Sequence, residues 1–212
     1  MVIVTGVSDH YGRAELVTVT VRDDVPVLLD RRRARLIEAG LPSAPYHHEG
    51  LHLPIDEAEQ VIRRTRASVA EHCRRAVDGL KSVLRVDAIV IQESPYPELP
   101  ESVSQVFASR PLTNAADGML YREELATQAS AMRLAVHRFP RKSDQLGAAS
   151  KALGCSASDV AAILTKFGKS VGPPWRKEHK LAAAAALCVL AAATRPRHHR
   201  HHARPSLLDG EP

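Results

Sequence analysis

The sequence has little of what marks disulfide-bonded, secreted or membrane proteins. Its three cysteines, Cys73, Cys155 and Cys188, lie far apart and form no Cys-x-x-Cys pair, so neither a disulfide framework nor a zinc ribbon is indicated. The longest apolar run, residues 181–193, is shorter than the roughly 20 residues that a membrane-spanning helix requires. The N-terminus lacks the basic start and long apolar stretch of a signal peptide. These absences predict a cytoplasmic protein that is not inserted in a membrane.

Aromatic residues are also scarce, at 4% of the chain. A surface that binds single-stranded nucleic acid by base stacking needs several exposed aromatic rings, so such a surface is not expected. The single tryptophan, Trp175, follows Pro173 and Pro174 and is interpreted as an anchor for the last helix. The formal net charge of +5 is compatible with a nucleic-acid partner without requiring one.

The overall composition is that of a globular protein, with 44% hydrophobic and 25% charged residues. A single domain is predicted over residues 1–194. Residues 195–212 have the polar, proline-containing composition of a disordered tail, basic and rich in His and Arg. The HHRHH run at 198–202 could bind a transition metal, but a flexible tail supplies no fixed geometry.

The first 30 residues predict three antiparallel strands. Residues 2–7 are apolar and β-rich, residues 14–21 alternate Val and Thr, and residues 25–30 follow the turn at Asp23 and Asp24. Residues 40–54 contain three prolines and two glycines, and are expected to form an irregular loop.

Helices and strands then alternate. Residues 55–84 show helical periodicity opposite a charged face, and residues 86–91 form an apolar run typical of a buried strand. Residues 115–133 are helical in pattern, and residues 134–139 predict a strand that stops at Pro140. The predicted order is therefore three strands, helix, strand, helix, strand.

The remaining chain is helical, over residues 144–153, 156–167 and 175–193. Ser156 and Asp159 have the spacing of a capping box. Residues 146–164 also have the pattern of a DNA-binding helix-turn-helix. The second helix would expose mainly small side chains, Ala157, Ser158, Ala161 and Ala162, which favours a helical pair packed on the sheet.

Carboxylates follow two of the predicted strands. Asp9 comes directly after the first strand and Glu93 directly after the fourth, so parallel pairing of these strands would bring the two acids together. Glu178, in the first turn of the last helix, could supply a third. Because neighbouring carboxylates repel, a hard divalent cation is the expected counter-ion, and Mg²⁺ or Mn²⁺ is predicted.

The order of elements, with GVSDHYG in the first strand, IVIQE at the fourth and EHKLAAAAAL in the last helix, resembles the RNase H-like superfamily. Within it, the RuvC-type Holliday-junction resolvases look most similar. The resemblance implies an α/β fold with a mixed five-stranded sheet (βββαβαβα) flanked by helices, and extra C-terminal helices. It spans residues 2–193 in layout and rests on three short motifs.

The resemblance implies a metal-dependent nuclease in which Asp9, Glu93 and Glu178 hold the metal and His179 assists as ligand or proton shuttle. Two departures open an alternative. A serine precedes Asp9, and Lys177 and Lys180 flank the site in the last helix. A non-catalytic module that binds nucleic acid or protein, or a helix-turn-helix protein, therefore stays open beside the nuclease.

Basic residues bracket the end of the fifth predicted strand. Arg138, Arg141 and Lys142 form a plausible phosphate-contacting edge, and DNA is favoured over RNA as the partner. A homodimer is expected only by analogy with the resolvases. His47, His48 and Glu49 could form a zinc-like cluster, but their spacing is not a specific one, and solvated loop residues are the favoured interpretation.

Overall fold

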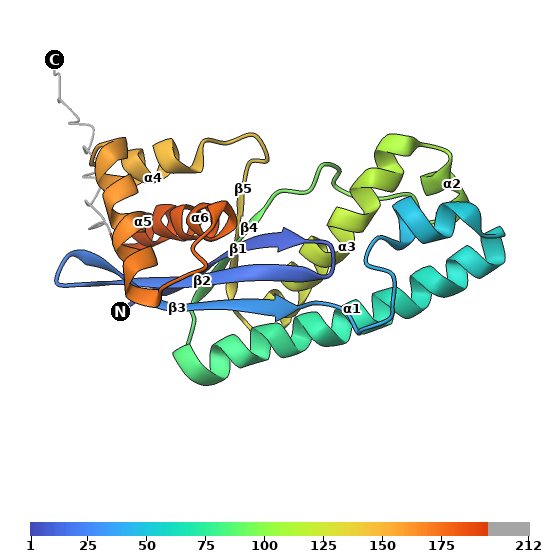
Figure 1. Ribbon diagram of the computed structural model, residues 1–212, viewed down its shortest axis with the longest axis horizontal. Helices are drawn as coiled ribbons and strands as arrows, with labels where there is room; N and C mark the ends of the chain where they lie inside the picture. The colour runs from blue at the N-terminus through green and yellow to red at the C-terminus, as the bar shows by residue number, and fades with distance from the viewer. Residues whose placement is uncertain (195–212) are drawn as a thin grey trace, which may run out of the picture.

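The computed structural model describes residues 1–194; the predicted tail and its HHRHH run lie outside these residues. A five-stranded sheet has the order β3-β2-β1-β4-β5 (Figure 1). The first three strands pair antiparallel, whereas β1, β4 and β5 are parallel. The mixed sheet confirms the prediction. The strands are β1 Ile3–His10, β2 Arg13–Arg22, β3 Val25–Arg35, β4 Ala88–Gln92 and β5 Ala135–Phe139.

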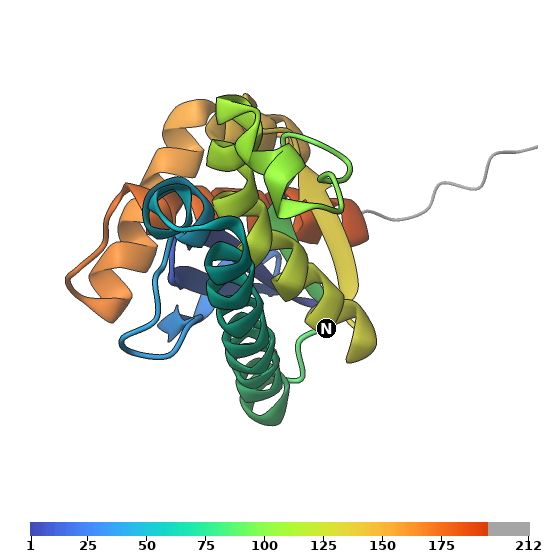
Figure 2. The same ribbon diagram turned by 90° about the vertical axis from the view of Figure 1, so that its right-hand side faces the viewer.

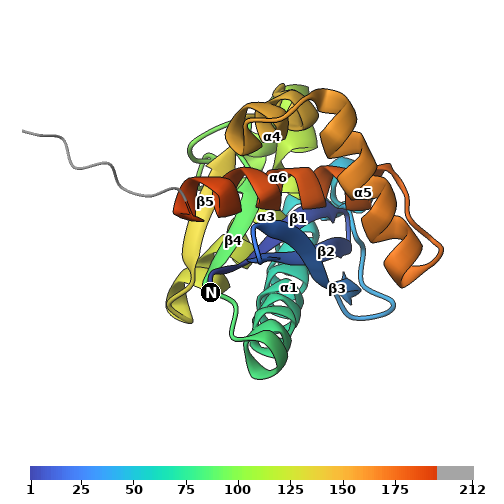
Figure 3. The same ribbon diagram turned by 90° about the vertical axis from the view of Figure 1, so that its left-hand side faces the viewer.

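Helices cover both faces of the sheet (Figures 2 and 3). The long helix α1 and helix α3 pack on one face, and α4, α5 and α6 on the other. Figure 3 shows α6 crossing in front of the strands with α1 behind them. The helices are α1 Ile55–Leu84, α2 Val103–Phe107, α3 Arg110–Ala131, α4 Gln145–Leu153, α5 Ala157–Val171 and α6 Lys177–Thr194.

Side chains alternate between the two faces along each strand. In β1, Val7 lies in the core beneath α1 and α3, whereas Val4 lies in the core beneath α6. The parallel partner β4 follows the same rule, with Ile89 on the α1 and α3 side and Val90 on the α6 side. A shift of one residue at a strand end therefore moves a side chain to the opposite face of the sheet.

Helix α6 lies unusually close to β1. A Cβ atom added to Gly6 would lie 1.8 Å from the backbone oxygen of Ala182, so only glycine fits at this position. The helix presents small side chains to the sheet, and the alanines from Ala182 to Ala186 are all buried. The alanine-rich sequence is therefore a packing feature that brings the start of α6 down onto the strand ends.

The stretch expected to be an irregular loop contains two short helical turns, a π-helical turn Pro45–Glu49 and a 3-10 turn Gly50–His52. The fully buried carboxylate of Asp117 in α3 holds the first turn. It accepts hydrogen bonds from the backbone N–H groups of Tyr46, at 3.0 Å, and His47, at 2.9 Å. This carboxylate fixes a segment that has no hydrophobic periodicity of its own.

Burial gives Asp117 a measurable effect on stability. Desolvation raises its pKa from 3.8 to about 6, although the two backbone N–H groups act in the opposite direction. Because the folded protein holds this proton more tightly than the unfolded chain, the group stabilises the fold at pH 4 and the contribution is lost as the pH rises through about 6. One pKa unit corresponds to ~1.4 kcal/mol, so the change is roughly 3 kcal/mol.

The measurement is urea unfolding of the wild type and Asp117→Asn between pH 4 and pH 7. The wild type is expected to gain unfolding free energy relative to the variant as the pH falls, since asparagine does not titrate. A difference between the two proteins that is independent of pH would show that Asp117 titrates normally in the fold.

Helices α4 and α5 pack against α6 as a pair. Ala149 of α4 and Val160, Leu164 and Phe167 of α5 are buried in the core that α6 shares with the sheet. The predicted capping box is present, since Ser156 and Asp159 each accept from the other's backbone N–H. The first turns of α5 expose Ala157, Ser158 and Ala161, which offer few groups for reading base edges.

The other sequence features have simple structural counterparts. Cys73 is buried, Cys155 and Cys188 are half-buried, and all three are free thiols. Within residues 1–194, none of the helices combines the length and the apolar character needed to cross a membrane.

Candidate functional site

Asp9 lies near the end of β1, on the face of the sheet that α3 covers. Its carboxylate forms an ion pair with Arg122 of α3, with 2.8 Å between Oδ2 and Nη2, and accepts a second bond from Nε at 3.3 Å. The side chains are only 6% and 11% exposed. The guanidinium group of Arg122 is therefore the counter-ion of Asp9, where the sequence had predicted a divalent cation.

Arg122 also connects Asp9 to the end of β4. Its Nη1 donates to the backbone oxygen of Glu93 at 3.2 Å, whereas the Glu93 residue itself is exposed. Strands β1 and β4 are parallel neighbours, so Asp9 and Glu93 do lie at the same edge of the sheet, as predicted. One buried arginine, and not two facing carboxylates, joins these two strand ends.

Glu178 and His179 lie on the opposite face of the sheet. Both belong to the first turn of α6, where Glu178 is half-buried and His179 is buried. The hydrogen bond between the Glu178 carboxylate and its own backbone N–H lowers the pKa of that group. Asp9 instead contacts α3, which covers the other face of the sheet.

The residues that face α6 at these two strand ends lie one position before Asp9 and Glu93. Ser8 pairs in register with Glu15 of β2, and the Glu15 carboxylate contacts His179 of α6. Gln92 lies two residues beyond Val90, which belongs to the α6-side core, and its amide donates to the backbone oxygen of Arg141. The α6 side of the two central strand ends therefore carries a hydroxyl and an amide in place of carboxylates.

The buried carboxylate of Glu15 is the centre of a polar network that the sequence reasoning missed. One carboxylate oxygen lies 3.2 Å from Nε2 of His179, and the other lies 2.5 Å from Nη2 of Arg33. The backbone N–H of Arg176 donates to Nδ1 of His179, so Nε2 carries the proton that His179 donates to Glu15. The sequence signal for this network was Glu15 itself, a charged residue in the largely apolar strand sequence RAELVTV at residues 13–19.

The environment of His179 favours its neutral form. Burial lowers the pKa of the imidazole, and the opposing effect of the Glu15 carboxylate does not cancel that shift. The indole of Trp175 stacks on the ring, with 5.5 Å between centroids. Trp175 therefore anchors the start of α6, as its place beside two prolines suggested. His179 is held on both nitrogens and is part of this anchor.

The residues present do not fit a divalent metal centre in this arrangement. Within residues 1–194, no group of three or more His, Cys, Asp or Glu side chains is placed to hold a metal ion. Asp9 is neutralised by Arg122 and Glu15 by Arg33. Glu178 belongs to α6, which packs on the other face of the sheet from α3. His47 and His48, whose rings stack on each other at 4.6 Å, likewise belong to no such group in the described part of the chain.

A cleft of about 240 Å³ opens at the carboxyl end of β1. Asp9, His10 and Tyr11 line one side. The rest of the lining includes Asn114, Gly118 and Arg122 of α3, together with Arg141. Arg141 and its neighbour Lys142 are exposed. Arg138 does not line this cleft. Its guanidinium pairs with Glu123 at 2.6 Å and donates to the backbone oxygen of Gln92.

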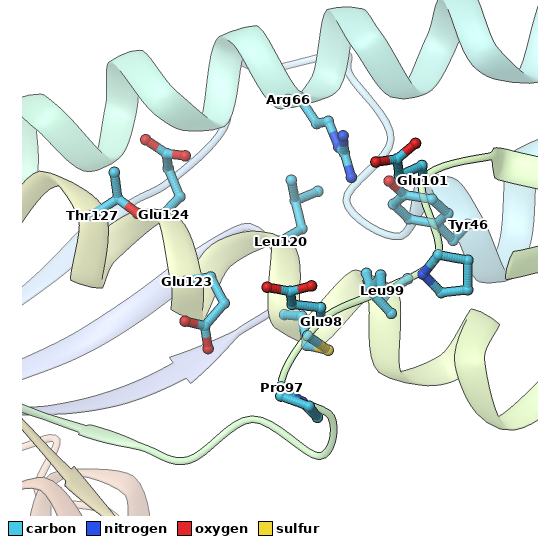
Figure 4. A pocket seen from close by; sticks show the side chains of 13 residues that line it. Tyr46, Arg66, Pro97, Glu98, Leu99, Glu101, Leu120, Glu123, Glu124 and Thr127 are labelled. Carbon is cyan, nitrogen blue, oxygen red and sulfur yellow. The ribbon is translucent and has the colours of Figure 1, made fainter.

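A larger cavity, of about 480 Å³, lies between α1, α3 and the segment after β4 (Figure 4). Four glutamates line it, with Arg66 of α1 beside the Tyr46 ring. The figure shows Glu98 and Glu123 near one another and Arg66 pointing toward Glu101. This excess of negative charge opposes the binding of phosphate groups. The glutamates are Glu98, Glu101, Glu123 and Glu124.

Comparisons with known proteins identify the fold. No protein-family profile matches the chain, and no curated protein sequence matches it. Among solved structures, Thermus thermophilus RuvC in complex with a Holliday junction substrate is similar, with a TM-score of 0.53 and 15% identity over 91% of this chain and 95% of that one. Thermus thermophilus RuvC alone gives a TM-score of 0.51 and 13% identity, covering 90% and 95%. The protein therefore has the RNase H-like fold and is structurally similar to the RuvC Holliday-junction resolvase.

Proposed function

We propose that the protein binds DNA at the end of the sheet where β1, β4 and β5 finish, and that it does so without metal-dependent cleavage. The observation that carries the proposal is the buried ion pair of Asp9 with Arg122. An arginine that is already bonded to both oxygens of Asp9 and to the backbone of Glu93 leaves no pair of carboxylates for a metal.

The charge at this end of the sheet supports DNA as the partner. Arg141 and Lys142 follow β5, Arg176 precedes α6 and Lys177 begins it; all four are exposed. Glu178 in the same turn interacts electrostatically with His10 at the end of β1, which places the start of α6 beside the strand ends. Exposed lysines and arginines that can contact phosphates supply most of the affinity of sequence-independent DNA binding. A solved RuvC structure of similar fold contains a Holliday junction.

Metal-dependent cleavage is the second candidate, and the similarity to RuvC favours it. In that hypothesis Asp9, Glu93 and Glu178 hold Mg²⁺ or Mn²⁺ and His179 assists. It requires that Arg122 release Asp9 and that the first turn of α6 reach the α3 side of the sheet. Both changes would break buried contacts, so the non-cleaving function is preferred.

Fluorescence anisotropy of labelled four-way junction, duplex and single-stranded DNA, in EDTA, tests the proposal. The wild type is expected to bind, and Arg141→Glu/Lys142→Glu is expected to weaken binding at least about tenfold on every substrate, because lost phosphate contacts carry no sequence information. The matched control is Arg22→Glu/Arg85→Glu. These exposed arginines lie at the opposite end of the sheet, after β2 and before β4.

The two charge-reversed proteins have the same net charge, so they separate a local contact from a general electrostatic effect. Equal loss of affinity in both would show that the basic residues after β5 have no special part. A wild type that binds none of the three substrates would reject DNA binding itself.

A further inference from the structure

The second half of β3 has an arginine-rich sequence, RRRAR at residues 31–35. Strand β3 is one of the two edge strands of the sheet, and beside it lies α1 with its own arginines. Between the two is a groove of about 280 Å³. Its charged and polar lining consists of Arg32, Arg33, Arg35, His72 and Arg75. No acidic side chain lines the groove within residues 1–194.

Acidic partners neutralise only part of this charge. Arg32 pairs with Asp30 and donates to the backbone oxygen of Gly79, and Arg33 pairs with Glu15. On α1, one carboxylate, Glu71, serves two guanidinium groups, those of Arg74 and Arg75. The side chains of Arg74 and Arg75 are 49% and 65% exposed. The surface around the groove therefore keeps an excess of positive charge that faces solvent.

At Arg35 the excess of positive charge destabilises the sheet of the protein without a bound anion. It lies directly opposite Arg13 in the antiparallel pairing of β3 with β2, and both residues are exposed. In the described part of the chain neither arginine forms an ion pair. Like charges directly opposite each other on neighbouring strands destabilise a sheet. A bound anion would relieve the repulsion.

We propose that this groove binds phosphate groups of a nucleic-acid backbone, as a second contact surface separate from the one after β5. The inference rests on the proposed DNA-binding function. The β3 residues that line the groove run from Arg32 to Arg35. A strand rises about 3.3 Å per residue, so they extend over about 10 Å. That length suits consecutive phosphates of a strand better than a single phosphate ion.

The test is the salt dependence of DNA affinity for Arg35→Gln/Arg75→Gln. Each phosphate contact contributes about 0.9 to the slope of log K against log salt for duplex DNA. We expect the double variant to reduce the slope by about 1 to 2 and the affinity by about fivefold or more at low salt. The matched control, Arg22→Gln/Arg85→Gln, removes two exposed arginines at the far end of the sheet and should leave the slope unchanged.

The outcomes separate this inference from the function on which it rests. If Arg141→Glu/Lys142→Glu weakens binding but Arg35→Gln/Arg75→Gln behaves as its control, the groove is not a DNA contact and the proposed function stands. If the wild type binds no DNA, both proposals fail. Displacement of DNA by poly-glutamate in the wild type, with no change of slope in the groove variant, would assign the groove to an acidic peptide and overturn the inference. Equal melting temperatures of the variants establish that each is folded.

Discussion

Replacement of Arg122 by alanine is expected to lower the free energy of unfolding by about 3–5 kcal/mol, as found when one partner of a buried ion pair is removed. The substitution leaves the Asp9 carboxylate, 6% exposed, without its counter-ion. It also removes the donor to the backbone oxygen of Glu93. Urea unfolding followed by circular dichroism measures the effect as a change in midpoint at constant slope.

Two further variants decide how the result is interpreted. Arg22→Ala, at an exposed position, should change stability by less than about 0.5 kcal/mol. Adding Asp9→Asn to Arg122→Ala should recover part of the loss, because the double variant no longer buries an unpaired charge. A loss below about 1 kcal/mol for Arg122→Ala would mean that solvent reaches Asp9.

Gly6→Ala is expected to be the other strongly destabilising substitution. The new methyl group would meet the backbone oxygen of Ala182 at 1.8 Å, and a backbone atom in a packed helix cannot move aside as a flexible side chain can. We expect a loss of at least about 3 kcal/mol, at the upper end for overpacking. Differential scanning calorimetry would record it as a lower melting temperature.

The matched control for this substitution is Gly118→Ala. Gly118 lies within α3, and a Cβ atom there would have no neighbour within 4 Å. Alanine in place of a helical glycine should stabilise the protein by about 0.5–1 kcal/mol. If both substitutions proved harmless, α6 would not lie against β1 at the distance described.

The fold could be predicted from the sequence because its signals are local and repeated. Three short strands separated by turns, one buried apolar run and long periodic helices indicate the sheet and its layers. The pattern could not show that residues 45–49 form a helical turn, because Asp117, some 70 positions away in the chain, holds that segment. Nor did it place the start of α3, which begins at Arg110 and not at residue 115.

The candidate site was harder to predict because it depends on the face of a strand. Asp9 and Glu93 were correctly expected at one edge of the sheet, but the pairing of strands does not state which face a terminal side chain occupies. Ser8, which looked like an insertion before the acid, lies on the α6 side, and Asp9 consequently turns toward α3. The sequence did not indicate that Arg122 is buried, because it stands in a charged stretch, REE, that is typical of a solvent-exposed helix face.

The most direct test of the whole account is a cleavage assay on a labelled four-way junction with Mg²⁺ or Mn²⁺ present, in which binding is followed on a native gel and strand integrity on a denaturing gel. We predict that the wild type retards the junction and leaves every strand intact. Cleavage by the wild type that Asp9→Asn and the exposed-site variant Glu93→Gln both abolish would contradict the account, because it would require a metal at the position that Arg122 occupies.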